Sequence, residues 1–142
     1  MLELRPCEPG HIKYIHPQLN AREDYHVMCS PEYAGIITDN FAISAWNGST
    51  CVGAAGIVPI YKGRAAAWAL ISKSAGPYMA QLTRAVRKGL MIDPTPRIET
   101  VVNADFINGH RWARMVGMEC ECPLMRKHGV HGQDEALYVR IK

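Results

Sequence analysis

The residues best suited to chemistry lie in one short stretch, Ile71-Ser-Lys-Ser-Ala-Gly-Pro-Tyr78, between an apolar segment and a segment of helical periodicity. Backbone N–H groups and the positive dipole end at a helix start favour an anion. Lys73 adds a cation, Gly76 allows close approach, and Ser72 and Ser74 add hydroxyl donors. The stretch therefore predicts an anion site, although Pro77 removes one N–H donor. The alternative is an ordinary helix start with small polar residues.

Side chains that could act as a general base are scattered through the second half of the chain. The candidates are Glu119, Glu121, His110 and Asp105, and no sequence context selects one of them. The chain contains no H-x-x-x-H or H-E-x-x-H pattern, no Gly-x-Ser-x-Gly elbow and no phosphate-binding Gly-x-x-x-x-Gly-Lys-Ser/Thr loop. We therefore assign no catalytic residue and expect no metal site.

Turn residues and periodicity predict the elements that position these groups. Strands are expected over 2–5, 41–46, 50–58, 65–71, 97–103, 119–125 and 135–141, and helices over 9–15, 20–28, 77–90 and 105–116. The segment 31–40 is either a short helix or a loop. Pro59 is expected to end its strand, and Asn103 or Asp105 to cap the last helix. Trp112, Met115 and Val116 are expected on the buried face of that helix.

This order of elements resembles that of the GNAT family of acetyl-CoA-dependent N-acetyltransferases. The carboxy-terminal half adds a likeness in sequence. Segment 97–105 is similar to the family's fifth strand, segment 109–118 to the helix that follows it, with a Gly117 corner, and segment 136–140 to a closing strand. The resemblance implies an α/β (α+β) GNAT fold in a single domain over residues 1–142. The fold has a mixed, mostly antiparallel, twisted central sheet of about six to seven strands, flanked by about four helices.

More narrowly, the chain resembles small GNAT-like proteins of short-tailed phages, including internal virion proteins. The shared features are a Leu-Arg-Pro start, a Gly-x-x-Pro strand matched by Gly56-Ile-Val-Pro59, and a tryptophan on the next strand matched by Trp68.

The resemblance assigns the stretch after the fourth strand to the coenzyme pyrophosphate. The predicted coenzyme-binding residues are Ile71, Ser72, Lys73, Ser74, Ala75, Gly76, Tyr78 and Asn108. The basic cluster on the following helix, Arg84, Arg87 and Lys88, either meets the coenzyme 3′-phosphate or forms a solvated face.

Two family positions on the last helix are changed. Where the family places an asparagine for the pantetheine arm, this chain has Phe106, with Asn103 and Asn108 nearby. Where the family places a tyrosine as general acid, it has Ala113. The departure weakens the expectation of ordinary acid catalysis.

Composition limits the remaining function classes. The formal net charge of +3 does not indicate nucleic acid, and no apolar run is long enough for a membrane helix. Two functions remain. One is transfer of an acetyl group from acetyl-CoA to an amine of a protein or small molecule. The other is a weak or inactive GNAT-like phage protein inside the virion or bound to a host factor. The expected location is the cytoplasm, or the virion for a phage protein, and self-association is left open.

Overall fold

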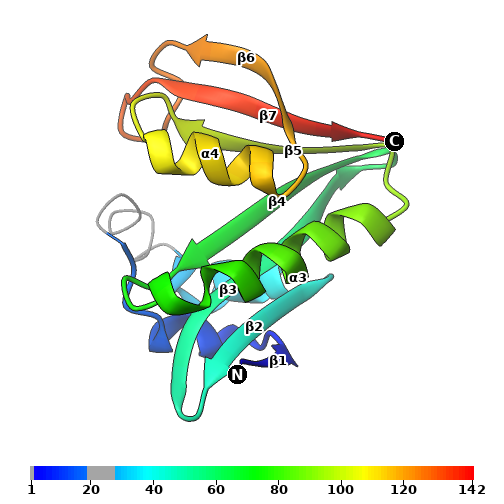
Figure 1. The fold of residues 1–142 in the computed structure, drawn as a ribbon. Coiled ribbons are helices and arrows are strands. Elements are labelled where there is room, and N and C mark those ends of the chain that lie inside the picture. The colour runs from blue at the N-terminus through cyan, green and yellow to red at the C-terminus, as the bar shows by residue number, and fades with distance from the viewer. Residues whose placement is uncertain (1, 19–27) are drawn as a thin grey trace. The chain divides into compact units, whose positions relative to one another are not determined.

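The computed structural model describes residues 2–18 and 28–142. Its strands hydrogen-bond in the order β1-β2-β3-β4-β5-β7-β6 (Figure 1). The chain forms two compact units, residues 1–59 with 67–82 and residues 60–66 with 83–142. The predicted mixed, mostly antiparallel α/β fold is confirmed, whereas a single domain over 1–142 stays a prediction. The helix expected over 20–28 lies, but for Met28, outside the described residues.

The sheet of the N-terminal unit contains β1 (Glu3–Pro6), β2 (Ala42–Asn47) and most of β3 (Thr50–Tyr61), together with residues 67–71 of the next strand, β4. β2 pairs antiparallel with both β1 and β3. The hairpin between β2 and β3 turns at Gly48, whose φ of 61° lies in the left-handed region that glycine adopts without a steric penalty.

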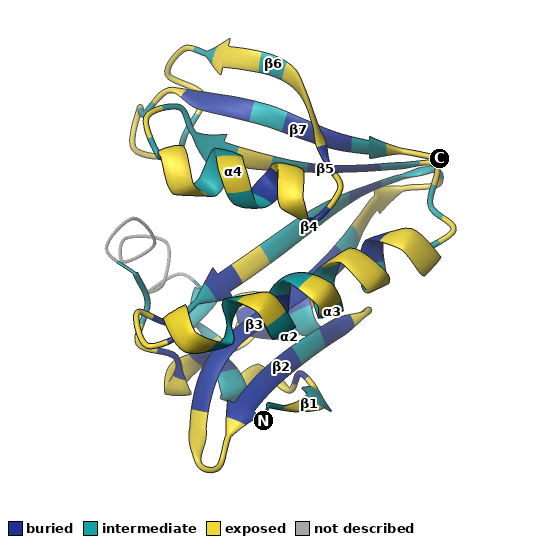
Figure 2. Cartoon of the chain, in the orientation of Figure 1, coloured by how far each residue is buried: buried dark blue, intermediate teal, exposed yellow. Residues whose placement is uncertain are grey.

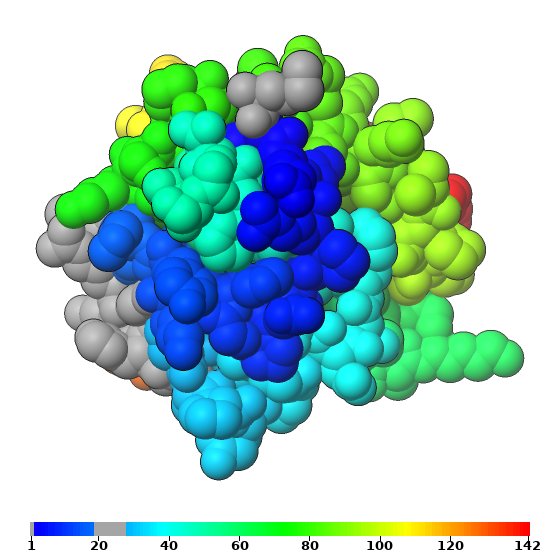
Figure 3. All heavy atoms as spheres, turned by 90° about the horizontal axis from the view of Figure 1, so that it is seen from below, coloured from blue at the N-terminus to red at the C-terminus, as the bar shows by residue number. Residues whose placement is uncertain are grey.

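The 3-10 helix η1 (Pro9–Tyr14) and the helix α2 (Pro31–Thr38) pack against each other, and in Figure 3 the blue residues of η1 lie beside the cyan residues of α2. Pro31 opens α2 and the Ser30 hydroxyl accepts the Tyr33 N–H at 3.3 Å, so the segment 31–40 is a capped helix rather than a loop.

Strands β2 and β3 are buried on both faces over most of their length, whereas β1 is largely exposed (Figure 2). One apolar cluster joins β2 and β3 to η1 and α2 through residues such as Ile12 and Ile37. The second joins the same strands to the start of α3 (Met79–Ile92) through Val52, Ala75 and Leu82. The loop before α3 is therefore anchored to the sheet by core packing.

Strand β3 continues past Pro59, contrary to the prediction that the proline ends it. β2 reaches only as far as the pairing of Ala42 with Gly56. Pro59 therefore lies beyond the partner to which its missing N–H would have donated.

The C-terminal unit is built on β5 (Arg97–Asn103), β6 (Glu119–Met125) and β7 (Glu135–Ile141), with α4 (Ile107–Met115) between β5 and β6 in the chain. β7 pairs antiparallel with both β5 and β6. The first residues of β4 (Arg64–Ile71) pair in parallel with β5. The predicted ranges of β5, β6 and β7 are confirmed.

Two details of α4 differ from the prediction. Its N-cap residue is Phe106, with no side-chain capping bond, so neither Asn103 nor Asp105 caps it. Val116 is buried, but Met115 is 55% exposed and Trp112 is half-buried, where its indole N–H donates to Thr83 Oγ1 at 2.9 Å. The apolar stripe of this helix is narrower than periodicity suggested.

Charged side chains from β4, β5 and β6 form an ion ladder in the C-terminal unit. Arg64 and Arg97 both donate to Glu99, and the bond from Arg97 Nε measures 2.8 Å. Arg97 also donates to both carboxylate oxygens of Glu121, at 2.9 and 2.6 Å. The hydrogen bond from Arg64 is the main cause that lowers the pKa of Glu99, which is 8% exposed. The carboxylate of Glu99 is therefore stabilised in its charged form.

Replacing Glu99 with Gln should lower the free energy of unfolding by about 1–3 kcal/mol at pH 7, because two guanidinium groups lose a charged acceptor. The Glu99 pKa is depressed in the folded chain. Its contribution is therefore complete above the unfolded value of about 4.3 and is lost as the pH falls through the folded value. Urea unfolding of wild type and variant between pH 7 and pH 3 measures this.

Glu119→Gln is the control, because Glu119 is an exposed carboxylate on β6. Its effect should stay within about 0.5 kcal/mol. If Glu99→Gln lowers the free energy of unfolding as much at pH 3 as at pH 7, the ion ladder is not the source of the loss.

Candidate functional site

The predicted anion-binding stretch forms a continuous loop between β4 and α3. It contains the 3-10 turn η3 (Gly76–Tyr78), which leads directly into α3. Ser72 and Ala75 are buried, with 1% and 0% exposure, whereas Lys73, Ser74 and Gly76 are exposed. Together with Pro77, which has no N–H to offer, these three can meet a ligand from solvent.

Backbone hydrogen bonds fix the start of this loop from two sides. Ser72 N–H donates to the Val52 carbonyl of β3 at 3.0 Å. Lys73 N–H donates to the His16 carbonyl at 2.9 Å, and Gln18 N–H donates to the Ile71 carbonyl at 3.2 Å. The start of the loop is thus bonded to β3 on one side and, through an isolated antiparallel bridge, to residues 16–18 on the other.

Most N–H donors of the loop are already satisfied within the chain. Ser74 N–H donates to Ser72 Oγ at 3.2 Å, Ala75 N–H to the Ser72 carbonyl at 3.0 Å, and Tyr78 N–H to the Ala75 carbonyl at 2.8 Å. Among the described residues, the N–H of Gly76 has no such partner, and a side chain built at Gly76 would meet nothing within 4 Å. An anion here would be held by that N–H and by the side chains of Lys73 and Ser74.

The side chain of Tyr78 points away from this donor set. Its hydroxyl oxygen accepts a hydrogen bond from Asn47 Nδ2 at 2.6 Å, and its ring packs against the cluster that contains Val52 and Leu82. Tyr78 therefore fastens the loop to the β2–β3 hairpin. Its bulk does not fill the space beside Gly76.

Residues of α4 take different positions in the C-terminal unit. Asn108 lies in the first turn and is exposed, while Ala113 is 4% exposed on the buried face. The position at which the sequence resemblance expected a tyrosine therefore holds a buried methyl group.

The general-base candidates also differ in their surroundings. Both ring nitrogens of His110 lie within hydrogen-bond distance of a partner, and Glu121 binds Arg97. Asp105 and Glu119 are exposed. The geometry selects none of the four, so the catalytic residue stays unassigned.

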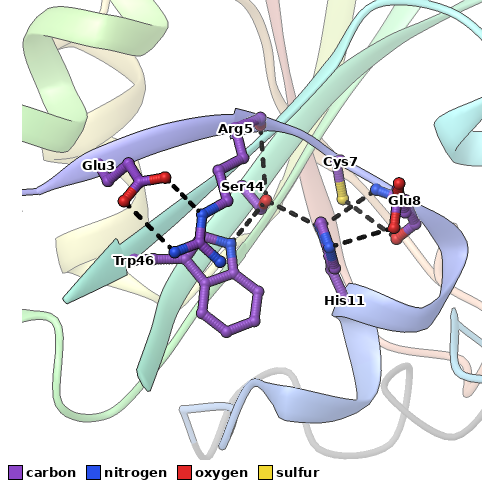
Figure 4. Close-up of polar contacts among 7 residues, drawn as sticks. All are labelled: Glu3, Arg5, Cys7, Glu8, His11, Ser44 and Trp46. Atoms are coloured by element: carbon purple, nitrogen blue, oxygen red, sulfur yellow. Dashed lines mark hydrogen bonds and ion pairs between the residues drawn. The ribbon is translucent and has the colours of Figure 1, made fainter. Parts of the chain in front are cut away.

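A polar cluster that sequence reasoning missed lies in the N-terminal unit (Figure 4). Ser44 Oγ is 3.0 Å from His11 Nδ1, and His11 Nε2 is 3.6 Å from a Glu8 carboxylate oxygen. These are the residue types of a nucleophilic triad. Ser44, however, is fully buried and accepts a hydrogen bond from Trp46 Nε1 at 2.9 Å. A substrate cannot reach this hydroxyl.

The same cluster explains how η1 begins. His11 Nδ1 accepts the Glu8 N–H at 3.1 Å, and the Glu8 side chain accepts the His11 backbone N–H in return. The two residues therefore form a capping box. Burial raises the pKa of the neighbouring Cys7 to about 12, so its thiol stays protonated at neutral pH. The i, i+3 spacing of Glu8 and His11 was the sequence signal for this structural role.

Among the residues that the structure describes, no group of three His, Cys, Asp or Glu side chains could hold a metal ion. Cys120 pairs with Tyr138 and Cys122 with Leu137, which are successive residues of β7, so a bulge turns the two thiols to opposite sheet faces. In residues 2–18 and 28–142, no helix is long and apolar enough to cross a membrane.

Comparison with known proteins identifies the fold. No family model matches the sequence, and no curated protein is significantly similar to it. An N-acetyltransferase from Staphylococcus aureus Mu50 has a TM-score of 0.74 at 10% identity, over 99% of this chain and 97% of that chain. A GNAT-family acetyltransferase from Bacillus anthracis has a TM-score of 0.69 at 12% identity, over 99% and 94%. A chimera of the Vibrio cholerae spermidine N-acetyltransferase SpeG and hSSAT has 0.72 at 16%, over 99% and 95%.

These matches span nearly the whole of each chain, so the predicted GNAT fold is confirmed. The identities are too low to carry a substrate or a catalytic residue from those proteins to this one.

Replacing Ala113 with Tyr should lower the free energy of unfolding by about 1–3 kcal/mol, because a large ring would enter a packed face of α4. Arg111→Tyr is the control, since Arg111 is exposed on the same helix. Thermal and urea unfolding compare the two variants. Equal stability would mean that the Ala113 position has room for the family's tyrosine.

Proposed function

We propose that the chain is an N-acetyltransferase that uses acetyl-CoA and an amine acceptor. The observation that carries the proposal is the GNAT fold with Lys73, Ser74 and the N–H of Gly76 exposed at the start of α3. This set contains a cation and two neutral donors, which suits a pyrophosphate. The buried Ser72 and Ala75 fix the loop, and Ile71 and Tyr78 anchor its two ends. All four stay proposed contacts of the coenzyme.

The proposed reaction is a direct transfer. The lone pair of the acceptor nitrogen attacks the thioester carbonyl carbon, a C–N bond forms and the C–S bond breaks. The coenzyme leaves as a thiolate that takes a proton from water, and the acceptor nitrogen gives up its proton to water. A thiol pKa of about 8.5 makes the thiolate a fair leaving group without an acid. A general acid adds about 10²–10⁴-fold, so Ala113 predicts slow turnover rather than none.

Asn108 is the proposed contact for the pantetheine arm, and the cytoplasm is the proposed location. Amines of proteins and polyamines are both candidate acceptors, the latter because one similar structure is named as a spermidine N-acetyltransferase.

A second candidate is a GNAT-like protein that no longer catalyses transfer, such as a phage virion protein. The buried Ala113 and the satisfied N–H groups of the loop favour it. Calorimetric titration with acetyl-CoA and CoA separates the two candidates. Absence of binding at millimolar concentration would overturn the enzyme proposal. If acetyl-CoA binds but no amine tested causes the release of free CoA from it, the second candidate is favoured.

Replacing Gly76 with Asp should weaken coenzyme binding at least about tenfold, because a carboxylate would face the pyrophosphate. The space beside Gly76 is open, so the side chain should not disturb folding. Gly76→Asn is the matched control with the same shape and no charge, and it should bind clearly better than the Asp variant in the same titration. Equal affinity of wild type and Gly76→Asp would refute the loop as the anion site.

Lys73→Ala should also lower affinity about tenfold, and the loss should shrink as salt is raised, because screening weakens the cation's contribution. Lys62→Ala removes the same charge from the exposed turn before β4 and should bind as wild type does. Titrations at 50 mM and 500 mM salt test this. If Lys73→Ala lowers the affinity for the coenzyme equally at both salt concentrations, Lys73 acts through packing rather than through its charge.

A further inference from the structure

A side-chain bridge in the C-terminal unit connects β7 to the junction between β5 and α4. His110 Nδ1 lies 2.7 Å from the Tyr138 hydroxyl oxygen, and His110 Nε2 lies 2.8 Å from the Ala104 carbonyl oxygen. His110 belongs to α4, Tyr138 to β7, and Ala104 follows the last residue of β5. One imidazole ring therefore links three parts of the chain.

The chemistry of the partners determines where the proton on this ring lies. A carbonyl oxygen can only accept, so Nε2 of His110 must carry a hydrogen and donate it to Ala104. In neutral imidazole Nδ1 is then an acceptor, and the hydroxyl of Tyr138 donates to it. With Nε2 protonated, Nδ1 is the only ring nitrogen that could take a proton from a substrate, and the buried Tyr138 hydroxyl already occupies it. His110 is therefore not positioned to act as the general base.

Tyr138 provides a rigid end to the bridge. Its side chain is 0% exposed, and the guanidinium of Arg114 lies 5.5 Å from the centre of its ring. Burial is the main cause that raises the pKa of Tyr138, so the hydroxyl keeps the hydrogen that it donates. The phenol is therefore a fixed donor at neutral pH.

The start of α4 lacks the usual support of a side-chain cap. Phe106 at the N-cap makes no side-chain capping bond. Gly109 lets the helix approach β5, since a Cβ there would lie 2.5 Å from the Phe106 ring and 2.7 Å from Val102 Cγ1. The Ala104 N–H donates to the Asp134 carbonyl at 3.0 Å, so His110 completes the pairing of the Ala104 peptide groups.

We propose that His110 is a positioning residue, which holds the β5–α4 junction between Tyr138 and the Ala104 carbonyl and so sets the place of the first turn of α4. Asn108 lies in that turn, and its role with acetyl-CoA rests on the proposed function. Loss of the bridge would let the junction open and the first turn of α4 shift. Coenzyme affinity would then fall while the chemical step stayed nearly unchanged.

The first experiment needs no activity. Amide hydrogen exchange is measured by NMR in wild type, His110→Ala, Tyr138→Phe and the exposed-site control Arg111→Ala. The amides of Ala104 and Phe106 should exchange at least about tenfold faster in His110→Ala, since opening the junction exposes them. Tyr138→Phe removes only the donating hydroxyl, and it should change the same amides less. Amides within β7 should be unaffected. Unchanged exchange at Ala104 and Phe106 in both variants would overturn the proposal.

The second experiment measures steady-state acetyl transfer well below the unfolding temperature. We expect the KM for acetyl-CoA to rise about tenfold in His110→Ala with kcat within about threefold of wild type. His110→Gln keeps an N–H that can reach the Ala104 carbonyl, and it should restore most of the affinity. Arg111→Ala should match wild type in both constants.

The possible failures can be told apart. If wild type binds no acetyl-CoA, the proposed function fails, and hydrogen exchange alone tests whether His110 holds the β5–α4 junction. If wild type binds it and His110→Ala loses stability without any rise in KM, the bridge is purely structural and the positioning proposal is overturned. If His110→Gln behaves as His110→Ala does in KM and in exchange, the bond to Ala104 is not what holds the junction.

Discussion

The parallel pairing of β4 with β5 is the constraint on which the arrangement of the other elements depends. Arg64–Ala66 of β4 pair with Arg97–Glu99 of β5. Parallel neighbours cannot be joined by a tight hairpin, so the chain must return through a crossover. Here the crossover is α3, and its amino end consequently follows directly after β4. The exposed donors of Lys73, Ser74 and Gly76 owe their place to this connection.

The loop before α3 shows how stability and ligand binding compete for the same groups. Buried N–H groups must find acceptors, and those of Ser72 and Ala75 find them within the chain, as does the N–H of the exposed Ser74. Each bond that orders the loop removes a donor from a potential anion. The remaining donors rely on the charge of Lys73, so the proposed anion site would be a modest one.

The two polar clusters outside this loop serve to hold elements that apolar packing does not hold alone. In the N-terminal unit, His11 closes a capping box and contacts the buried Ser44, so η1 is fastened to β2. In the C-terminal unit, His110 links α4, β7 and the residue after β5. Both histidines have geometry that could suggest catalysis. Their partners show that both are bound on the ring nitrogens and serve the fold.

The sequence by itself determined most of the element order, because β-branched runs, the Asn47-Gly48 turn and the prolines act locally. The strands at 97–103, 119–125 and 135–141 were predictable to the residue. Tertiary structure decided the rest. Pro59 stays within β3 because β2 ends before it, and the N-cap position of α4 falls on Phe106, one residue after Asp105. Whether an N–H group of the loop is hydrogen-bonded within the chain, and which groups His110 contacts, depends largely on residues distant in sequence. Hydrogen bonds between such residues leave no local pattern.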